Sequence, residues 1–437
     1  MNGGDGAEAG YNHAPLDRLI ADDETFHPAR ATGPAPFAAD GCGRPMAVMP
    51  SAALAVLVVA LTSLGPLSTD FYLPALPAIA RALHTDSAGV QLTLSVYLLG
   101  FGAGQLLVGP LSDRCGRRPV MLWGMLVFLL STLVCVFAES LAVLVGARLV
   151  QALGACAGPV LGRAVVRDLY GPAESARVLS HVSTATALAP LLAPLFGGWL
   201  TAAWGWRATF VALAIYAMVL MLAVAALLKE TNRHPDAHAM RPARMLANYR
   251  TLLADPAYRG ALLIGCGAFA ALFAFISGSP FVFIEHFGMS PQQMGLAFGL
   301  NVTGFMIGST LSARHSRRLG PARLIRYGVW IGAACGVLLA ALAFASPQHP
   351  AAVMLPMWGV TAAIGLILPN ATALGLAGYP KMAGAAASLM GFVQMGLGAG
   401  AGMLVGHGVQ HGTAALGLTV AAGMLFALAA WSRSPAR

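Results

Sequence analysis

The sequence predicts an all-α membrane protein that crosses the bilayer twelve times. Hydrophobic residues make up 57% of the 437 residues and charged residues only 10%, whereas a soluble domain carries about a quarter charged residues. So few charges cannot cover a water-facing surface of this size, which indicates lipid as the solvent. Apolar runs of about 20 residues, the length that crosses the hydrocarbon core as a helix, recur along the chain. Unbroken apolar runs also exclude a membrane β-barrel, whose strands alternate apolar and polar residues.

Twelve apolar runs from Met46 onward are each expected to form one spanning helix. Two longer stretches, 327–380 and 382–432, contain no Asp, Glu, Lys or Arg and are too long for a single span. We divide the first at Ser346–Pro350 and the second between Gly406 and Gly412, because Pro and Gly interrupt helices. The expected spans are 46–72, 89–109, 119–138, 140–162, 178–200, 207–228, 260–284, 292–313, 326–345, 351–376, 384–405 and 413–432.

Basic residues are distributed unevenly between the loops, and this predicts the orientation. Arginines cluster after the second, fourth, sixth and eighth runs and Lys381 follows the tenth, whereas the alternate loops carry only Arg81 and Arg207. Loops rich in Lys and Arg stay in the cytoplasm. Both termini are therefore expected in the cytoplasm, with the chain in the lipid bilayer of a bacterial inner membrane. These loops explain the net charge of +9, and no nucleic-acid partner is expected.

The chain is expected to consist of a tail and two six-helix halves. Residues 1–45 hold seven acids among Gly, Pro and Ala, a composition typical of a disordered tail. The longest internal loop, 229–258, follows the sixth run and would be a cytoplasmic linker between halves at 46–228 and 259–437. Similar basic loops after the second and eighth runs indicate an internal repeat, which is the plan of many transporters.

Other classes of function leave no signature in the sequence. A P-loop GxxxxGK[ST], an HExxH and a GxSxG motif are all absent, so ATP-driven transport and membrane-embedded hydrolysis are not indicated. The six cysteines form no CxxC pair, and neither a disulfide framework nor a metal centre is expected. A channel would present rings of charge, not lone charges. We expect a transporter, not an enzyme, that needs no cofactor.

The loop after the second run resembles the signature loop of the major facilitator superfamily. The matching positions are Gly109, Asp113, Arg114, Gly116, Arg117 and Arg118. The resemblance implies the major facilitator fold, with twelve transmembrane helices in two pseudo-symmetric six-helix halves. Asp113 is expected to cap a helix end or to pair with an arginine across the cytoplasmic seam, as a latch that holds one conformation. An ordinary positive-inside loop would account for the arginines but not for Asp113 or the glycine spacing.

Two further motifs resemble those of the same superfamily. Arg148 and Gln151 match an Arg-x-x-Gln-Gly motif, with Ala152 in place of its Gly. The fifth run matches the helix-five motif of drug/proton antiporters, with Ala193 where Gly is usual, at Pro190, Pro194, Gly197 and Gly198. The helix-five motif separates exporters from importers, so the resemblance implies export. Gly and Pro are also common in membrane helices without such a role.

Two segments narrow the resemblance further. Leu67–Pro77 and Ser279–Pro291 are similar to the Bcr/CflA branch of twelve-helix antiporters, named for bicyclomycin and chloramphenicol resistance. The resemblance covers about residues 50–430 and implies a proton-coupled multidrug efflux transporter, a monomer that exchanges small molecules for protons by alternating access. Two alternatives stay open: an exporter of a specific metabolite such as an amino acid, a dipeptide or a sugar derivative, and a proton-coupled importer.

Asp70 is the expected proton-coupling residue, with Arg148 as its partner. It stands where the resembled family carries its helix-one acid, four residues before Pro74. Intramembrane charges are costly and mark functional sites. Arg148, well inside the fourth run, would hold Asp70 ionised until a proton or a cationic substrate arrives. A structural hydrogen bond at the outer interface is the alternative role for Asp70, and Glu285 is the next candidate for the proton site.

The substrate is expected to bind between the two halves near the bilayer midplane. Amides within apolar runs, and aromatic or methionine side chains, are the candidates to line that cavity. They are Tyr72, Gln151, Phe281, Asn301 and Gln394, followed by Phe273, Asn370 and Met390. The alternative for all of them is packing between helices or, for the amides, interhelical hydrogen bonding.

Overall fold

A computed structural model describes residues 51–170, 172–186, 188–232, 236, 239–345, 349–379, 382–408 and 412–434. Helices account for nearly all of this described part, and it contains no β-strand. The all-α fold is therefore confirmed. The predicted disordered tail, 1–45, lies outside the described residues.

The first half consists of helices that begin and end close to the expected runs. They are α1 (Ser51–Asp70), the 3₁₀ turn η2 (Leu73–Ala75), α2 (Leu76–Ala82), α3 (Ser87–Cys115), α4 (Arg117–Val136), α5 (Leu141–Ala155), α6 (Ala157–Leu169), α7 (Pro172–Thr186), α8 (Ala189–Trp204) and α9 (Arg207–Leu227). The side chains of Asp86 and Ser140 cap α3 and α5 by accepting backbone N–H groups, which satisfies donors that a helix start leaves free.

The second half repeats this plan. Its helices are α10 (Pro242–Ala254), α11 (Pro256–Pro280), the π-helical turn η3 (Phe281–His286), α12 (Pro291–Phe344), α13 (Ala351–Ala377), α14 (Ala383–Gly408) and α15 (Ala414–Ser432). Ser290 and Gln293 form a reciprocal capping box at the start of α12, so this helix begins sharply after the loop.

Ten helices in the described residues are long and apolar enough to cross a membrane. One of them, α12, has 54 residues and contains a non-helical Gly320, with φ 74° and ψ 159°. Gly tolerates this positive φ, and the break separates the expected spans 292–313 and 326–345. The expected span 178–200 is divided between α7 and α8, of 15 and 16 residues. With α12 counted as two spans and α7 with α8 as one, the helices account for all twelve runs.

The linker between the halves differs from the expected loop, because it contains the helix α10. Buried Leu252 of α10 packs in a cluster with Tyr258, Ala386 and Met390 of the second half. The next turn is also tied to that half, because the Tyr379 hydroxyl donates a hydrogen bond of 2.8 Å to Asp255. An apolar side chain that can be buried against a neighbour stabilises a helix of this length, which its sequence alone would leave marginal.

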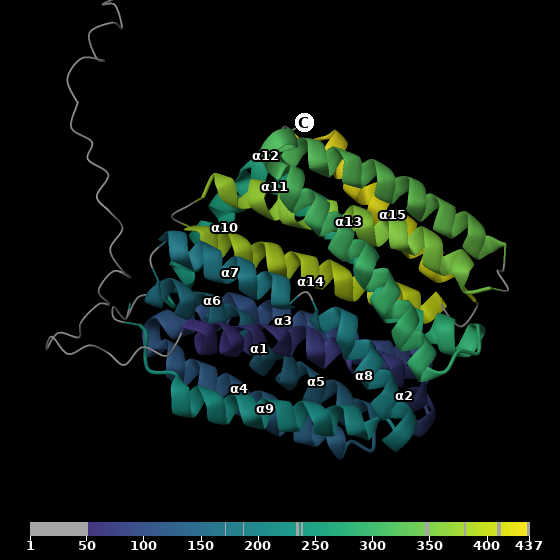
Figure 1. The fold of residues 1–437 in the computed structure, drawn as a ribbon, viewed down its shortest axis with the longest axis horizontal. Helices are drawn as coiled ribbons and strands as arrows, with labels where there is room; N and C mark the ends of the chain where they lie inside the picture. The colour runs from purple at the N-terminus through teal and green to yellow at the C-terminus, as the bar shows by residue number, and fades with distance from the viewer. Residues whose placement is uncertain are drawn as a thin grey trace, which may run out of the picture. The chain divides into compact units, whose positions relative to one another are not determined.

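The two halves meet along pairs of helices that are distant in sequence. In Figure 1, the helices of the first half, purple to teal, lie together, as do those of the second half, green to yellow, and α3 lies near α14 where they meet. A second seam joins α8 to α12. One hydrophobic cluster crosses the seam, from Tyr72 and Leu76 in the first half to Phe283 and Met294 in the second. The halves are thus packed together at the end of the bundle that contains η2, α2 and η3.

Candidate functional site

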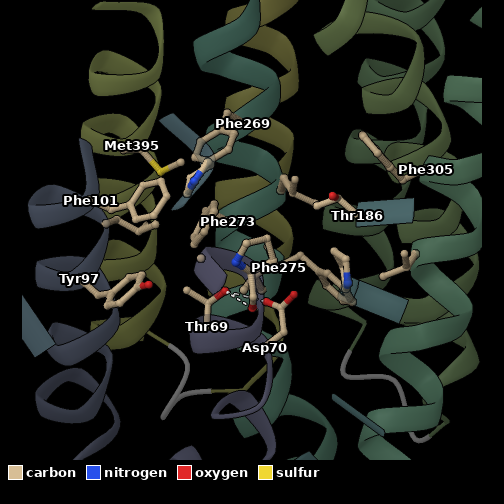
Figure 2. Close-up of a pocket in the computed structure, with 18 of the residues that line it drawn as sticks. Thr69, Asp70, Tyr97, Phe101, Thr186, Phe269, Phe273, Phe275, Phe305 and Met395 are labelled. Atoms are coloured by element: carbon tan, nitrogen blue, oxygen red, sulfur yellow. Dashed lines mark hydrogen bonds between the residues drawn. The ribbon is translucent and has the colours of Figure 1, made fainter. Parts of the chain in front are cut away.

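A cavity of about 420 Å³ lies between the two halves. Helices α1, α3, α6, α7 and α8 line it from the first half, and α11, α12, α13 and α14 line it from the second. Figure 2 shows Asp70 and Phe275 close together, with Phe101, Phe269 and Met395 further along the space. The cavity therefore stands where a site between two pseudo-symmetric halves is expected.

The walls of the cavity are mainly aromatic and aliphatic. Its phenylalanines are Phe101, Phe269, Phe273, Phe275, Phe298 and Phe305. Polar groups are few, and among the described lining residues only Asp70 and Arg163 have an acidic or a basic side chain. A cavity of this kind binds through apolar area, with a small number of polar groups to orient the ligand.

Asp70 is the last residue of α1, and its side chain lines the cavity while the residue is only 5% exposed. The Thr69 hydroxyl donates a hydrogen bond of 2.9 Å to Asp70 Oδ1, drawn in Figure 2. Within the described part of the chain, no ion pair involves this carboxyl. A buried carboxylate without a basic partner is costly when ionised, so this group is suited to gaining and losing a proton or a cationic ligand.

Arg148 lies behind the cavity wall. It is fully buried, and its Nη1 donates to the Ser68 carbonyl at 3.1 Å and to Gln151 Oε1 at 2.6 Å. Its guanidinium carbon lies 4.7 Å and 4.2 Å from the ring centroids of Tyr72 and Tyr97. The expected direct pair with Asp70 is absent from the described residues. The carbonyl of Ser68, two residues earlier, and the two aromatic rings take up the guanidinium instead.

The candidate substrate residues separate into two groups. Asn301 and Phe273 line the cavity, and Asn301 Oδ1 is buried without a hydrogen-bond partner. The others do not line it, because their helix faces turn toward other helices. Tyr72 packs on Phe210. Four more are buried between helices: Gln151, Phe281, Asn370 and Met390. Gln394 is half-buried, and its Nε2 lies close to Gly265 of α11.

Several lining residues escaped the sequence analysis, and Arg163 is the most informative. The expected fourth span ended at 162, which put Arg163 in a cytoplasmic loop. In the structure α6 continues to Leu169, and Arg163 lines the cavity with its Nε donating to the Pro159 carbonyl at 2.9 Å. Tyr97, Gln105 and Met395 were also missed. Gln105 is an amide within an apolar run, so the signal that marked Asn301 could have found it. Tyr and Met occur throughout the apolar runs, so residue type gave no signal for Tyr97 and Met395.

The signature loop forms a charged cluster within the first half. Arg117 donates to both Asp113 and Asp168, the latter at 3.0 Å from Nε. The Glu230 carboxylate accepts the backbone N–H groups of Arg117 and Arg118 at 2.8 Å and 3.1 Å. Asp113 thus pairs with an arginine of its own half, and within the described ranges it forms no ion pair across the seam. Gly116 adopts φ 98° beside Glu230, a backbone region that L side chains rarely enter.

The helix-five motif lies at the seam between α8 and α12. A methyl group at Gly198 would overlap the carbonyl oxygen of Pro291 in the second half, and one at Gly197 would overlap the Phe71 carbonyl. On the other side of the seam, Gly295 of α12 lies against the Pro194 carbonyl of α8. Pro190 lines the cavity. The small residues of the motif therefore allow backbones of the two halves to approach closely.

Glu285 lies away from the cavity. It is partly exposed on η3, and its Oε1 is 4.0 Å from Arg81 Nη1 across the seam. The side chain of Glu285 remains 47% exposed. The ionised carboxylate of Glu285 therefore loses far less hydration than that of Asp70 would.

Comparisons with known proteins agree with this architecture. Residues 55–403 match the family model described as Major Facilitator Superfamily. The chain is 32% identical to Multidrug resistance protein D of Escherichia coli over 386 residues, which cover 86% of this chain and 94% of that protein. It is 30% identical over 374 residues to a bicyclomycin resistance protein homolog of Haemophilus influenzae, covering 85% and 91%. The xylose transporter XylE of E. coli has the same fold, with a TM-score of 0.68 at 14% identity over 87% of this chain and 97% of that one.

The family match and the fold thus agree with the two-halved bundle, the cavity between its halves and the signature loop. Relatives of at least 30% identity extend over most of the chain and of their own length. The chain belongs to the Major Facilitator Superfamily of membrane transporters, and its resistance-protein relatives place it with the Bcr/CflA branch.

Proposed function

We propose that this protein exports small, largely apolar drug-like molecules across a bacterial inner membrane in exchange for protons. The observation that carries the proposal is one buried carboxyl, Asp70, in the wall of an otherwise apolar cavity. Relatives named for multidrug and bicyclomycin resistance support a drug-like substrate.

The orientation that the arginine distribution favours has both termini in the cytoplasm. The bundle is closed at its opposite end, where Ser87 and Ser95 donate to carbonyls of Gly406 and Ala399 at 3.0 Å each. Between them, Gln91 Nε2 donates to the Ser277 carbonyl at 3.1 Å. With this orientation the closed end faces outward, so we infer an inward-facing state that would accept substrate from the cytoplasm or the inner leaflet.

In the exchange that we propose, Asp70 binds a proton or the substrate in turn. A cationic or hydrogen-bonding substrate would enter the inward-facing cavity and displace the proton. Once the halves rock and open the other end, a proton from outside would displace the substrate and the protonated carrier would return. Ionisation of Asp70 in an apolar cavity needs compensation, so each step favours occupancy by one ligand or the other.

The cavity chemistry distinguishes the alternatives. A sugar derivative or dipeptide presents many hydrogen-bonding groups, and the aromatic walls offer few partners for them. An aromatic or chlorinated compound of moderate size would be matched by six phenylalanines. We therefore favour drug-like over sugar-like cargo, carried by a monomer, since one chain encloses the whole cavity.

Transport in everted membrane vesicles tests the proposal. The protein is produced in a host without its own efflux pumps, and a panel that contains bicyclomycin, chloramphenicol, cationic dyes, dipeptides and sugar derivatives is screened for gradient-driven accumulation. We expect accumulation of one or more aromatic or cationic compounds that an uncoupler abolishes. Accumulation of sugars or dipeptides alone, or transport that survives the uncoupler, would contradict it.

A further inference from the structure

A second cleft, of about 840 Å³, lies on the first half, away from the central cavity. At one end, where α3 ends and α4 begins, Arg114 and Arg118 line the cleft. Further along, its walls are Leu122, Trp123 and Leu126 of α4 and Met221 of α9. One end of the cleft is therefore basic and the other apolar. In the proposed exchange, neither the substrate nor the proton binds there.

The two arginines of the cleft are available to an anion. Arg118 is held in place because its Nη2 donates to the Ala225 carbonyl at 2.8 Å, while its Nε is buried without a partner. Arg114 is exposed. In the described part of the chain, neither takes part in an ion pair.

Glu230 also borders the cleft, but its charge is already compensated. Its carboxylate oxygens accept backbone N–H groups of Arg117, Arg118, Thr231 and Asn232 at 2.8–3.1 Å. A carboxylate at the start of α4 is also favoured by the helix dipole. The backbone therefore takes up the oxygens of Glu230, which forms no ion pair with Arg114 or Arg118 in the described residues.

The apolar end of the cleft runs into the membrane. Helix α4 has 20 residues from Arg117, the length that spans the hydrocarbon core, so its first turn lies at the level of the lipid headgroups. Leu126 lies eight residues after Arg118, about 12 Å further along the helix. Trp123 is 67% exposed on the outer surface, and Trp is enriched at the membrane interface.

We propose that this cleft binds an anionic phospholipid. Its phosphate would lie between Arg114 and Arg118, and one acyl chain would lie along Leu122, Trp123 and Leu126 beside Met221. Guanidinium groups bind phosphate oxygens through charge-assisted hydrogen bonds, and basic pockets between membrane helices are suited to anionic headgroups. A free phosphate would fill the basic end only and would leave the apolar wall uncovered.

Native mass spectrometry of the full-length protein in detergent measures this binding directly. Phosphatidylglycerol and phosphatidylcholine with identical acyl chains are titrated against the parent and against Arg114→Gln, Arg118→Gln and the double variant. We expect the parent to prefer phosphatidylglycerol, and each substitution to weaken it by about tenfold, the value of a charged hydrogen bond. Arg114 is exposed, so its variant should fold even if Arg118→Gln does not.

Two controls separate this site from general attraction to basic loops. Arg317→Gln with Arg318→Gln removes two exposed arginines of α12, next to its break at Gly320 in the second half, and should leave phosphatidylglycerol binding unchanged. Trp123→Gln should weaken phosphatidylglycerol binding while the arginines remain. The proposal would be overturned if the parent bound both lipids equally, or if the control variant lost as much phosphatidylglycerol binding as the cleft variants. It would also be overturned if inorganic phosphate displaced the lipid at a concentration equal to that of the lipid. None of these measurements depends on what the protein transports.

Discussion

The guanidinium of Arg148 lies 4.2 Å from the ring centroid of Tyr97, and Tyr97 lines the central cavity. The ring therefore stands between a fully buried positive charge and the space that also contains Asp70. Two nitrogens of Arg148, Nε and Nη2, have no hydrogen-bond partner. We expect this ring to screen the cavity from the charge of Arg148, so that changes of the ring alter what the cavity accepts.

Substitution of Tyr97 tests that relationship. Tyr97→Leu removes the cation–π contact, worth about 0.5–2 kcal/mol, and lets the positive charge of Arg148 act on the cavity. We expect Tyr97→Leu to lower the thermal stability of the protein and to reduce transport of cationic compounds more than that of neutral ones. Tyr97→Phe keeps the ring and is the matched control, expected to retain both. Equal transport of cations and neutral compounds by Tyr97→Leu would show that the ring does not screen Arg148.

Asp70→Asn should abolish uphill, proton-driven transport while substrate binding survives. The amide keeps the size of the carboxyl and can still accept the Thr69 hydrogen bond, but it cannot titrate. Accumulation in everted vesicles under an imposed pH gradient is the measurement, with binding followed separately on the purified protein. Glu285→Gln is the comparison variant, expected to accumulate substrate as the parent does. If Asp70→Asn accumulates substrate normally and Glu285→Gln does not, the proton site is at Glu285.

Substitutions in the signature loop should reduce transport while the protein still folds. Asp113→Asn removes one of the two carboxylates that Arg117 contacts and leaves Asp168 in place. Arg114→Ala removes an exposed charge. We expect both to reduce the rate of efflux at equal expression, because the loop must rearrange as the halves move. Normal efflux by both variants would mean that the cluster serves only to hold the first half together.

Gly198→Ala should weaken the closed end of the bundle. Its new methyl group would overlap the Pro291 carbonyl across the seam, so the state in which α8 and α12 are in contact becomes less stable. Ser87 is buried at the same closed end, where α3 meets α14, and a cysteine in its place should then react faster with an impermeant maleimide. Gly146→Ala is the control, because nothing lies within 4 Å of its added methyl group. Equal labelling in the two variants would contradict close contact at this seam.

The features that the sequence determined by itself are those set by local composition. Twelve hydrophobic runs specify twelve helices, because in lipid only helices and closed barrels satisfy the backbone's hydrogen bonds and unbroken apolar runs exclude a barrel. The glycines and charges around Asp113, and the acid at position 70, are likewise visible as residue types in unusual surroundings. From these the fold and the family followed, together with Asp70 and Asn301 as cavity residues.

What only the tertiary structure decided depends on how each helix is rotated and where it ends. Arg148 was visible as a buried charge, but the rings of Tyr72 and Tyr97 take it up because α1, α3 and α5 pack around it. Arg163 entered the cavity because α6 runs past the end of the apolar stretch. Gln151 and Gln394 look the same as Asn301 in an apolar run, yet they turn toward other helices. A run that is apolar on all sides carries no periodicity to mark its inward face, so contacts between helices must choose that face.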